Sequence, residues 1–141
     1  VGLLRRKSRV NYRTILEGDE AYIRFKGALA ENYVMSQFMC MGIESYFWRT
    51  KADAEVDFIT DNEGVLFPVE VKAADNTKAK GLHLFCNRYG CKMAFKTSLK
   101  NVGDNMDGKT HVWSIPLYIL FRLKEYVAYE MGWSKQDGNK L

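Results

Sequence analysis

The sequence predicts an α/β domain in which helices flank a mixed central β-sheet of about five strands. Short apolar runs of strand character alternate along the chain with longer segments of helical periodicity, in the order α-β-β-β-α-β-β-α. Glycine or proline stands at the boundaries of the helical segments, where helices commonly begin or end. Elements of both kinds in this order bury their apolar faces best when the helices pack on one sheet.

The first helix is expected over residues 25–41, ended by Gly42. Its apolar stripe is expected to contain Ala28, Met35, Phe38 and Met41. Glu31 falls on the same stripe. A carboxylate on the buried face of a helix costs free energy unless it has a partner, and a basic residue such as Arg49 is one candidate.

Two further helices and five strands complete the expected fold. One helix is expected from about residue 78 to 89, capped by Asn76 or Thr77 and ended by Gly90, and the other over residues 117–132 after Pro116. The strands are expected at residues 45–50, in the two arms of a hairpin around residues 61–64, at 93–98 and at 111–115. A polar loop is expected between the last two strands.

The hairpin carries three polar side chains among apolar ones, namely Asp57, Glu70 and Lys72. Glu70 and Lys72 are two residues apart on one strand, so both point to the same face, about 7 Å apart. If residues 61–64 form a four-residue loop, Thr60 lies opposite Val65, and Asp57 shares that face. A slip of one residue sends Asp57 to the other face.

Two carboxylates and an ammonium group on one sheet face can form a metal site. Mg²⁺ is usually held by one or two carboxylates together with water and substrate phosphate oxygens, and Asp57 and Glu70 supply such ligands. Lys72 can orient a metal-bound water or offset charge on the phosphorus that it attacks. The alternative is an ordinary ion pair on a solvated strand face.

The motif around these residues resembles a known signature. Asp57, twelve intervening residues and then Glu70-Val71-Lys72 match the D…(D/E)xK pattern of the PD-(D/E)XK, or restriction-endonuclease-like, nuclease superfamily. Val56 stands where the superfamily name has proline, which does not change the ligands. Over nearly its whole length the chain also resembles the C-terminal domain that follows the ATPase module in many prokaryotic AAA-type ATPases, in the segments FKGALAENYV, YFWRTKADAEVDFI, PVEVKA, KTSLKN and IPLYIL.

The resemblance implies a restriction-endonuclease-like sandwich and a metal-dependent nuclease that hydrolyses phosphodiester bonds in DNA. In that case Asp57 and Glu70 bind Mg²⁺ or Mn²⁺, Glu31 points across to the sheet and completes the metal site, and Lys72 positions the attacking water. The implied partners are DNA and an ATPase domain upstream of this chain. The alternative is a catalytically silent domain of the same fold that docks on DNA or regulates the ATPase.

Composition fits a single domain over residues 1–141. With 47% hydrophobic residues the chain can bury a core, and its net charge of +4 fits an anionic partner. Lys78 and Lys80, near the start of the second helix, can contact a phosphate backbone, or they are ordinary surface lysines. Three cysteines without a CxxC motif favour a reducing cytoplasm, and no window suits a membrane span. The start without methionine is expected of a piece of a longer ATPase.

Two further patterns point to functions that their context disfavours. Residues 103–110 satisfy GxxxxGK[ST], the phosphate-binding P-loop, but the residues that follow are strand-like rather than helical, so a turn between strands is favoured over nucleotide binding. His83, Cys86 and Cys91 lack a fourth zinc ligand and paired spacing, which favours core cysteines and a surface histidine.

Overall fold

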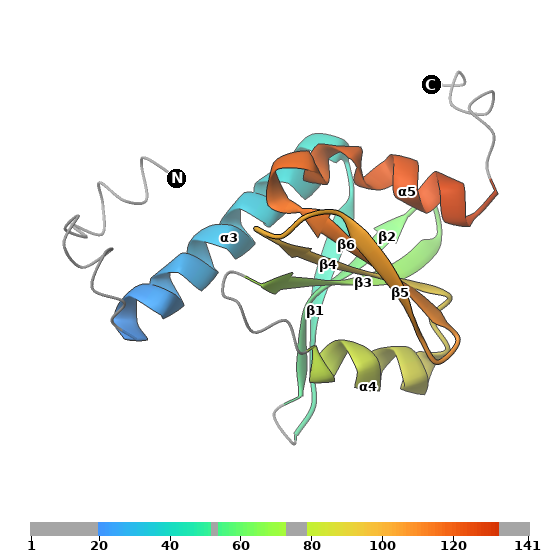
Figure 1. Cartoon of the computed structure of the whole chain (residues 1–141), viewed down its shortest axis with the longest axis horizontal. Helices are drawn as coiled ribbons and strands as arrows, with labels where there is room; N and C mark the ends of the chain where they lie inside the picture. Colours follow the sequence, from blue (N-terminus) through green and yellow to red (C-terminus); the bar gives the residue numbers. More distant parts are fainter. Residues whose placement is uncertain (1–19, 52–53, 73–78, 133–141) are drawn as a thin grey trace.

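The computed structural model describes residues 20–51, 54–72 and 79–132, which form one mixed β-sheet with helices on both faces (Figure 1). The strands are β1 (Glu44–Arg49), β2 (Glu55–Asn62), β3 (Val65–Lys72), β4 (Met93–Ser98), β5 (Gly103–Asp107) and β6 (Thr110–Pro116). The helices are α3 (Glu20–Met41), α4 (Lys80–Tyr89), the 3₁₀ helix η1 (Leu117–Arg122) and α5 (Leu123–Glu130). The predicted α/β class with a mixed sheet is confirmed.

The strand order is β1-β2-β3-β4-β6-β5. Strands β1, β2 and β3 are antiparallel neighbours, β3 pairs in parallel with β4, and β4 pairs in parallel with β6. Parallel neighbours need a crossover, and α4 lies in the connection from β3 to β4. The edge strand β5 then pairs antiparallel with β6.

Two apolar clusters lie on opposite faces of the sheet. The larger one packs side chains of α3, η1 and α5 against Phe58, Phe67, Val69, Phe95 and Ile115 of the strands. The smaller one packs Leu82, Phe85 and Cys86 of α4 against Val56, Ala94 and Val112. Figure 1 shows α4 apart from α3 and α5, with the strands between them. The alternation of β3 explains this, since Phe67, Val69 and Val71 all face the larger cluster.

The hairpin turn is tighter than expected. Asn62 pairs with Val65, so the turn contains only Glu63 and Gly64, and the expected four-residue loop is wrong. Both turn residues have positive φ, 56° and 79°, as a two-residue hairpin requires, and the Asp61 side chain accepts a hydrogen bond from the Gly64 amide at 2.8 Å. The register therefore differs by two residues, which leaves the paired residues from Phe58 to Val69 on their expected faces.

The first helix buries the predicted stripe only in part, at Phe38 and partly at Met41. Ala30, Val34 and Phe38 are buried, whereas Glu31 is exposed, as are Ala28 and Met35. The expected burial of Glu31 on that stripe is therefore wrong. Compared with the prediction, the helix is rotated so that Val34 is buried and the Glu31 carboxylate is exposed. This orientation avoids the free-energy cost of a desolvated charge.

The predicted polar loop at residues 103–107 is also wrong, because these residues form the sixth strand, β5. Asp107 pairs with Thr110, so Gly108 and Lys109 form a two-residue turn into β6. The GxxxxGKT stretch is thus a β-hairpin, which confirms the expectation of a turn between strands. The stretch continues directly into β6 and not into a helix whose amides could surround a phosphate.

The other helix boundaries agree in part with the predictions. Helix α4 ends at Gly90, whose φ is 67°, as expected, but it begins at Lys80. The expected caps Asn76 and Thr77, and Lys78, lie outside the described residues. The expected helix at residues 117–132 begins as the 3₁₀ helix η1 before α5. None of the helices in the described ranges is both long and apolar enough to cross a membrane.

Candidate active site

Asp57 lies where β2 and β3 stop pairing. The paired residues of the two strands extend from Asn62 opposite Val65 to Phe58 opposite Val69. One residue further on, the Asp57 Oδ2 atom accepts a hydrogen bond from the Val71 amide at 2.6 Å. The carboxylate therefore takes a donor that a continuing antiparallel ladder would give to a backbone carbonyl. This contact fixes the Asp57 side chain beside β3.

A β-bulge in β2 sets the direction of this part of the strand. Tyr46 pairs with Ile59 and Trp48 with Val56, so Phe47 of β1 faces two residues, Asp57 and Phe58. As a result Val56 packs in the α4 cluster while Phe58, two residues later, packs in the α3 cluster. Bulges redirect side chains in this way and are common beside functional sites.

Glu70 and Lys72 form a close ion pair on β3. The Lys72 Nζ atom donates to the Glu70 Oε1 atom at 2.5 Å. Glu70 is only 5% exposed, whereas Lys72 is half-buried. The other carboxylate oxygen of Glu70, Oε2, is buried and has no hydrogen-bond partner among the described residues. An unsatisfied buried acceptor costs about 1–3 kcal/mol, so this site holds a carboxylate at the expense of stability.

Burial raises the pKa of each of the three acids of the predicted site, and the charge of Asp57 raises the pKa of Glu70 and Glu31 further. Burial and then the charge of Asp57 raise the pKa of Glu70, although Lys72 opposes both effects. Burial also raises the pKa of Asp57, against the lowering effects of the Val71 amide and Lys72. For Glu31, partial burial and the charges of Asp57 and Glu55 raise the pKa. Glu31 therefore lies near enough to feel Asp57, from the exposed side of α3.

The arrangement fits an open site for a hard divalent cation rather than a closed cage. Among the residues that the structure describes, no group of three or more His, Cys, Asp or Glu side chains is close enough to hold a metal ion. Mg²⁺ needs only one or two carboxylates, because water and substrate phosphate complete its octahedral shell. The unsatisfied Oε2 atom of Glu70 and the crowded negative charge of Asp57 are features that such a cation would compensate.

The surface near the site is divided between two hollows instead of one groove. Asp57 lines a cavity of about 390 Å³ together with Met35, Tyr46 and Phe47. Lys72 lines a different cavity of about 260 Å³. Glu70 lines neither of these two cavities. Asp57 and Lys72 therefore line separate cavities.

The cavity at Lys72 contains residues that the sequence did not single out. Lys96 and Lys100 line it with Lys72. Lys80, a predicted phosphate contact, is exposed at the first residue of α4 and lines neither cavity. The lysines of the cavity come together through the parallel pairing of β3 and β4, which no local sequence pattern reveals.

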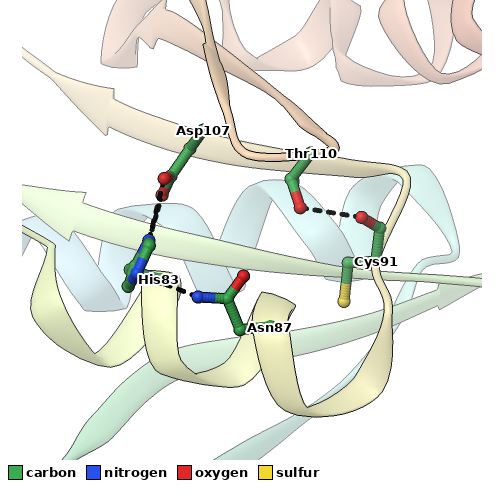
Figure 2. Close-up of polar contacts among 5 residues, drawn as sticks. All are labelled: His83, Asn87, Cys91, Asp107 and Thr110. Atoms are coloured by element: carbon green, nitrogen blue, oxygen red, sulfur yellow. Dashed lines mark hydrogen bonds and ion pairs between the residues drawn. The ribbon is translucent and has the colours of Figure 1, made fainter.

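The His83, Cys86 and Cys91 group has a structural explanation. The Nδ1 atom of His83 contacts the Asp107 carboxylate at 2.7 Å and its Nε2 atom contacts the Asn87 side-chain amide at 2.9 Å (Figure 2). His83 is exposed and Cys86 is buried in the α4 cluster, as predicted. A hydrogen bond between the two thiols, with burial, raises the pKa of Cys86, and the same hydrogen bond lowers the pKa of Cys91. The Cys91 carbonyl accepts from Thr110 at 2.8 Å.

Fold and site together define an α/β domain with a mixed six-stranded sheet, in which two acids and a lysine meet where two strands separate. The chain belongs to the family described as domain of unknown function DUF4143, whose model matches residues 26–120. The matched region includes all four predicted catalytic residues, Glu31, Asp57, Glu70 and Lys72. No curated protein matches the chain.

Proposed function

We propose that this domain is a metal-dependent nuclease of the PD-(D/E)XK type that hydrolyses phosphodiester bonds in DNA. The observation that carries the proposal is the buried carboxylate of Glu70, which is paired with Lys72, acted on by the charge of Asp57 and left with one unsatisfied oxygen. Side chains that only stabilise a fold are rarely left in this condition, whereas functional sites keep such unfavourable arrangements.

In the proposed mechanism Asp57 and Glu70 would hold Mg²⁺ or Mn²⁺, and Glu31 would complete the site from α3. When bound, the ion would provide a water of lowered pKa and polarisation of the phosphoryl group. The Val71 amide keeps Asp57 beside β3, so this ligand needs little reorganisation. Lys72 has three N–H donors, of which one goes to Glu70, so the ammonium can also orient the attacking water or a phosphate oxygen.

The cellular setting is part of the same proposal. The resemblance to domains that follow AAA-type ATPase modules supports an upstream ATPase as the partner within a longer protein. A reducing cytoplasm suits the three cysteines, which are free in the structure. The ATPase would then act on the same DNA that this domain cleaves.

A catalytically silent DNA-docking or regulatory domain is the second candidate. It is favoured by the pairing of Lys72 with Glu70 at 2.5 Å and by the small exposure of Glu70. In that case the carboxylates would form an ion pair without a catalytic role, and the domain would bind DNA or the ATPase without cleaving DNA. The two candidates differ in whether the domain cleaves DNA when a metal ion is added.

Cleavage of labelled linear and supercoiled DNA in Mn²⁺, in Mg²⁺ and in EDTA separates these candidates. We expect the wild type to cleave only with metal, and Asp57→Asn and Glu70→Gln to lose at least 100-fold in rate, since ligands to the same metal are removed. Glu63→Gln, which neutralises an exposed carboxylate in the turn of the same hairpin, is the matched control and should cleave normally. Metal-dependent cleavage that persists in Asp57→Asn at the wild-type rate would refute the proposed site.

A further inference from the structure

We infer that the cavity lined by Lys72, Lys96 and Lys100 binds a phosphate of the DNA backbone next to the phosphate that is cleaved. The inference deepens the proposed function, since it takes DNA as the ligand from that proposal. The cavity measures about 260 Å³. Small-molecule sites are commonly about 300–1,000 Å³, so this hollow suits one phosphate group of a chain that continues outside it.

The sheet register places this cavity beside the carboxylates. Glu70 of β3 pairs with Lys96 of β4, and Lys96 in turn pairs with Ser114 of β6. In the next row Lys72 pairs with Ser98. Paired residues on neighbouring strands share a face and lie about 5 Å apart. The cavity therefore begins one strand away from Glu70, on the same face of the sheet.

Among the described residues, the apolar cluster under helix α4 ends before this part of the face. The helix packs on Ala94 and Val112, which precede Lys96 and Ser114 by two residues on their strands. The face that is apolar under α4 thus becomes polar at the ends of β4 and β6. Apolar residues on this face give way to lysine and serine where the cavity begins. Polar side chains that line a cavity are typical of a ligand site and not of an apolar core.

The charges and donors of the cavity fit an anion. Three lysines and one acid, Asp104, line the cavity. Lys72 is paired with Glu70, and the Asp104 carboxylate contacts the His111 Nε2 atom at 2.9 Å. Lys96 and Lys100 therefore supply the further positive charge. The remaining polar residues that line it are Ser98, Asn101, Asn105 and Ser114. The Lys100 amide donates to the Ser98 side-chain oxygen at 3.1 Å, which ties the loop after β4 to the strand. Lysine is a common phosphate ligand, acting as a point charge.

Binding of a labelled DNA duplex in EDTA tests the inference without cleavage. The variants are Lys96→Gln, Lys100→Gln and the double variant, which remove charge and keep most of the side-chain stem. Lys109→Gln, in the exposed β5–β6 turn, is the matched control. We expect each single variant to weaken binding several-fold and to lower the slope of log K against log salt by about 1, and the double variant by about 2.

The outcomes separate this inference from the nuclease proposal. Lysine-dependent binding in EDTA supports the phosphate site even if the wild type never cleaves DNA. Unchanged binding and salt slope in the double variant, or a loss no larger than that of Lys109→Gln, would overturn it even if cleavage depends on Asp57. Recovery of binding in Lys96→Arg, with circular dichroism unchanged in every variant, shows that the lost charge and not a lost fold is responsible.

Discussion

Replacing Glu70 by glutamine should stabilise the fold at neutral pH. Glutamine has nearly the same shape, and it replaces the buried carboxylate by a neutral amide, whose burial costs less free energy. Relief of the desolvation penalty of a buried, unsatisfied charged acceptor is worth about 1–3 kcal/mol, and the change from a charged to a neutral acceptor for Lys72 costs about 1 kcal/mol. The net gain is about 1 kcal/mol, which corresponds to a rise in Tm of about 3–4 °C for a domain of this size.

The gain should depend on pH in a defined direction. Because burial raises the pKa of Glu70 in the folded state, the folded chain binds more protons than the unfolded chain between the unfolded pKa of 4.5 and the raised value. The wild type therefore loses stability as the pH rises through that window, and Glu70→Gln does not. The difference between the two should shrink as the pH falls to 4.5.

Urea denaturation of the wild type and Glu70→Gln at pH 7 and pH 4.5, with Glu63→Gln as control, measures both effects. A variant that is less stable than the wild type at pH 7 by 1 kcal/mol or more would refute the reasoning. That result would mean that the ion pair with Lys72 supports the fold, and the unsatisfied oxygen would no longer indicate a site kept for function.

Three further predictions test other parts of the structure. Gly81→Ala should destabilise the fold by about 1–3 kcal/mol or prevent folding, because an added Cβ meets the Glu55 carbonyl oxygen at 1.8 Å, and thermal unfolding measures it. A hydrogen bond to Asp104, then one to Glu130, raises the pKa of His111 above 6.5, so the wild type should lose stability relative to His111→Gln as the pH rises from 6.5 to 9, in urea titrations. Mn²⁺ should raise the Tm of the wild type but not that of Asp57→Asn, because a ligand that binds only the folded state stabilises it.

The parts of the fold that follow local rules could be predicted from the sequence. The shared face of Phe67, Val69 and Val71 in β3 and the stop of α4 at Gly90 are properties of a few adjacent residues, and both are found in the structure. The length of the hairpin turn could not be predicted from adjacent residues. Asp61 and Asn62 are residue types common in turns, but they extend the strand because Glu63 and Gly64 adopt positive φ and form the turn alone. The weakly apolar strand β5 forms because β6 offers it a partner, which its own sequence does not indicate.

The candidate site was predictable in composition but not in geometry. Asp57, Glu70 and Lys72 stand out as polar residues in apolar strands, and the structure brings them together. The direction of Asp57 depends on a bulge opposite Phe47 in another strand, and Glu31 is exposed because Val34 takes the buried position. Lys96 joins the site only through parallel pairing with a strand more than twenty residues away.

Calorimetric titration of Mn²⁺ into the wild type and into Asp57→Asn and Glu70→Gln tests the central claim most directly. We expect saturable binding by the wild type, at least a tenfold loss of affinity in each variant, and normal binding by Glu63→Gln, because Asp57 and Glu70 are proposed as metal ligands and Glu63 is not. Equal heats for the wild type and both site variants, whether large or negligible, would contradict the claim that these two carboxylates form a metal site.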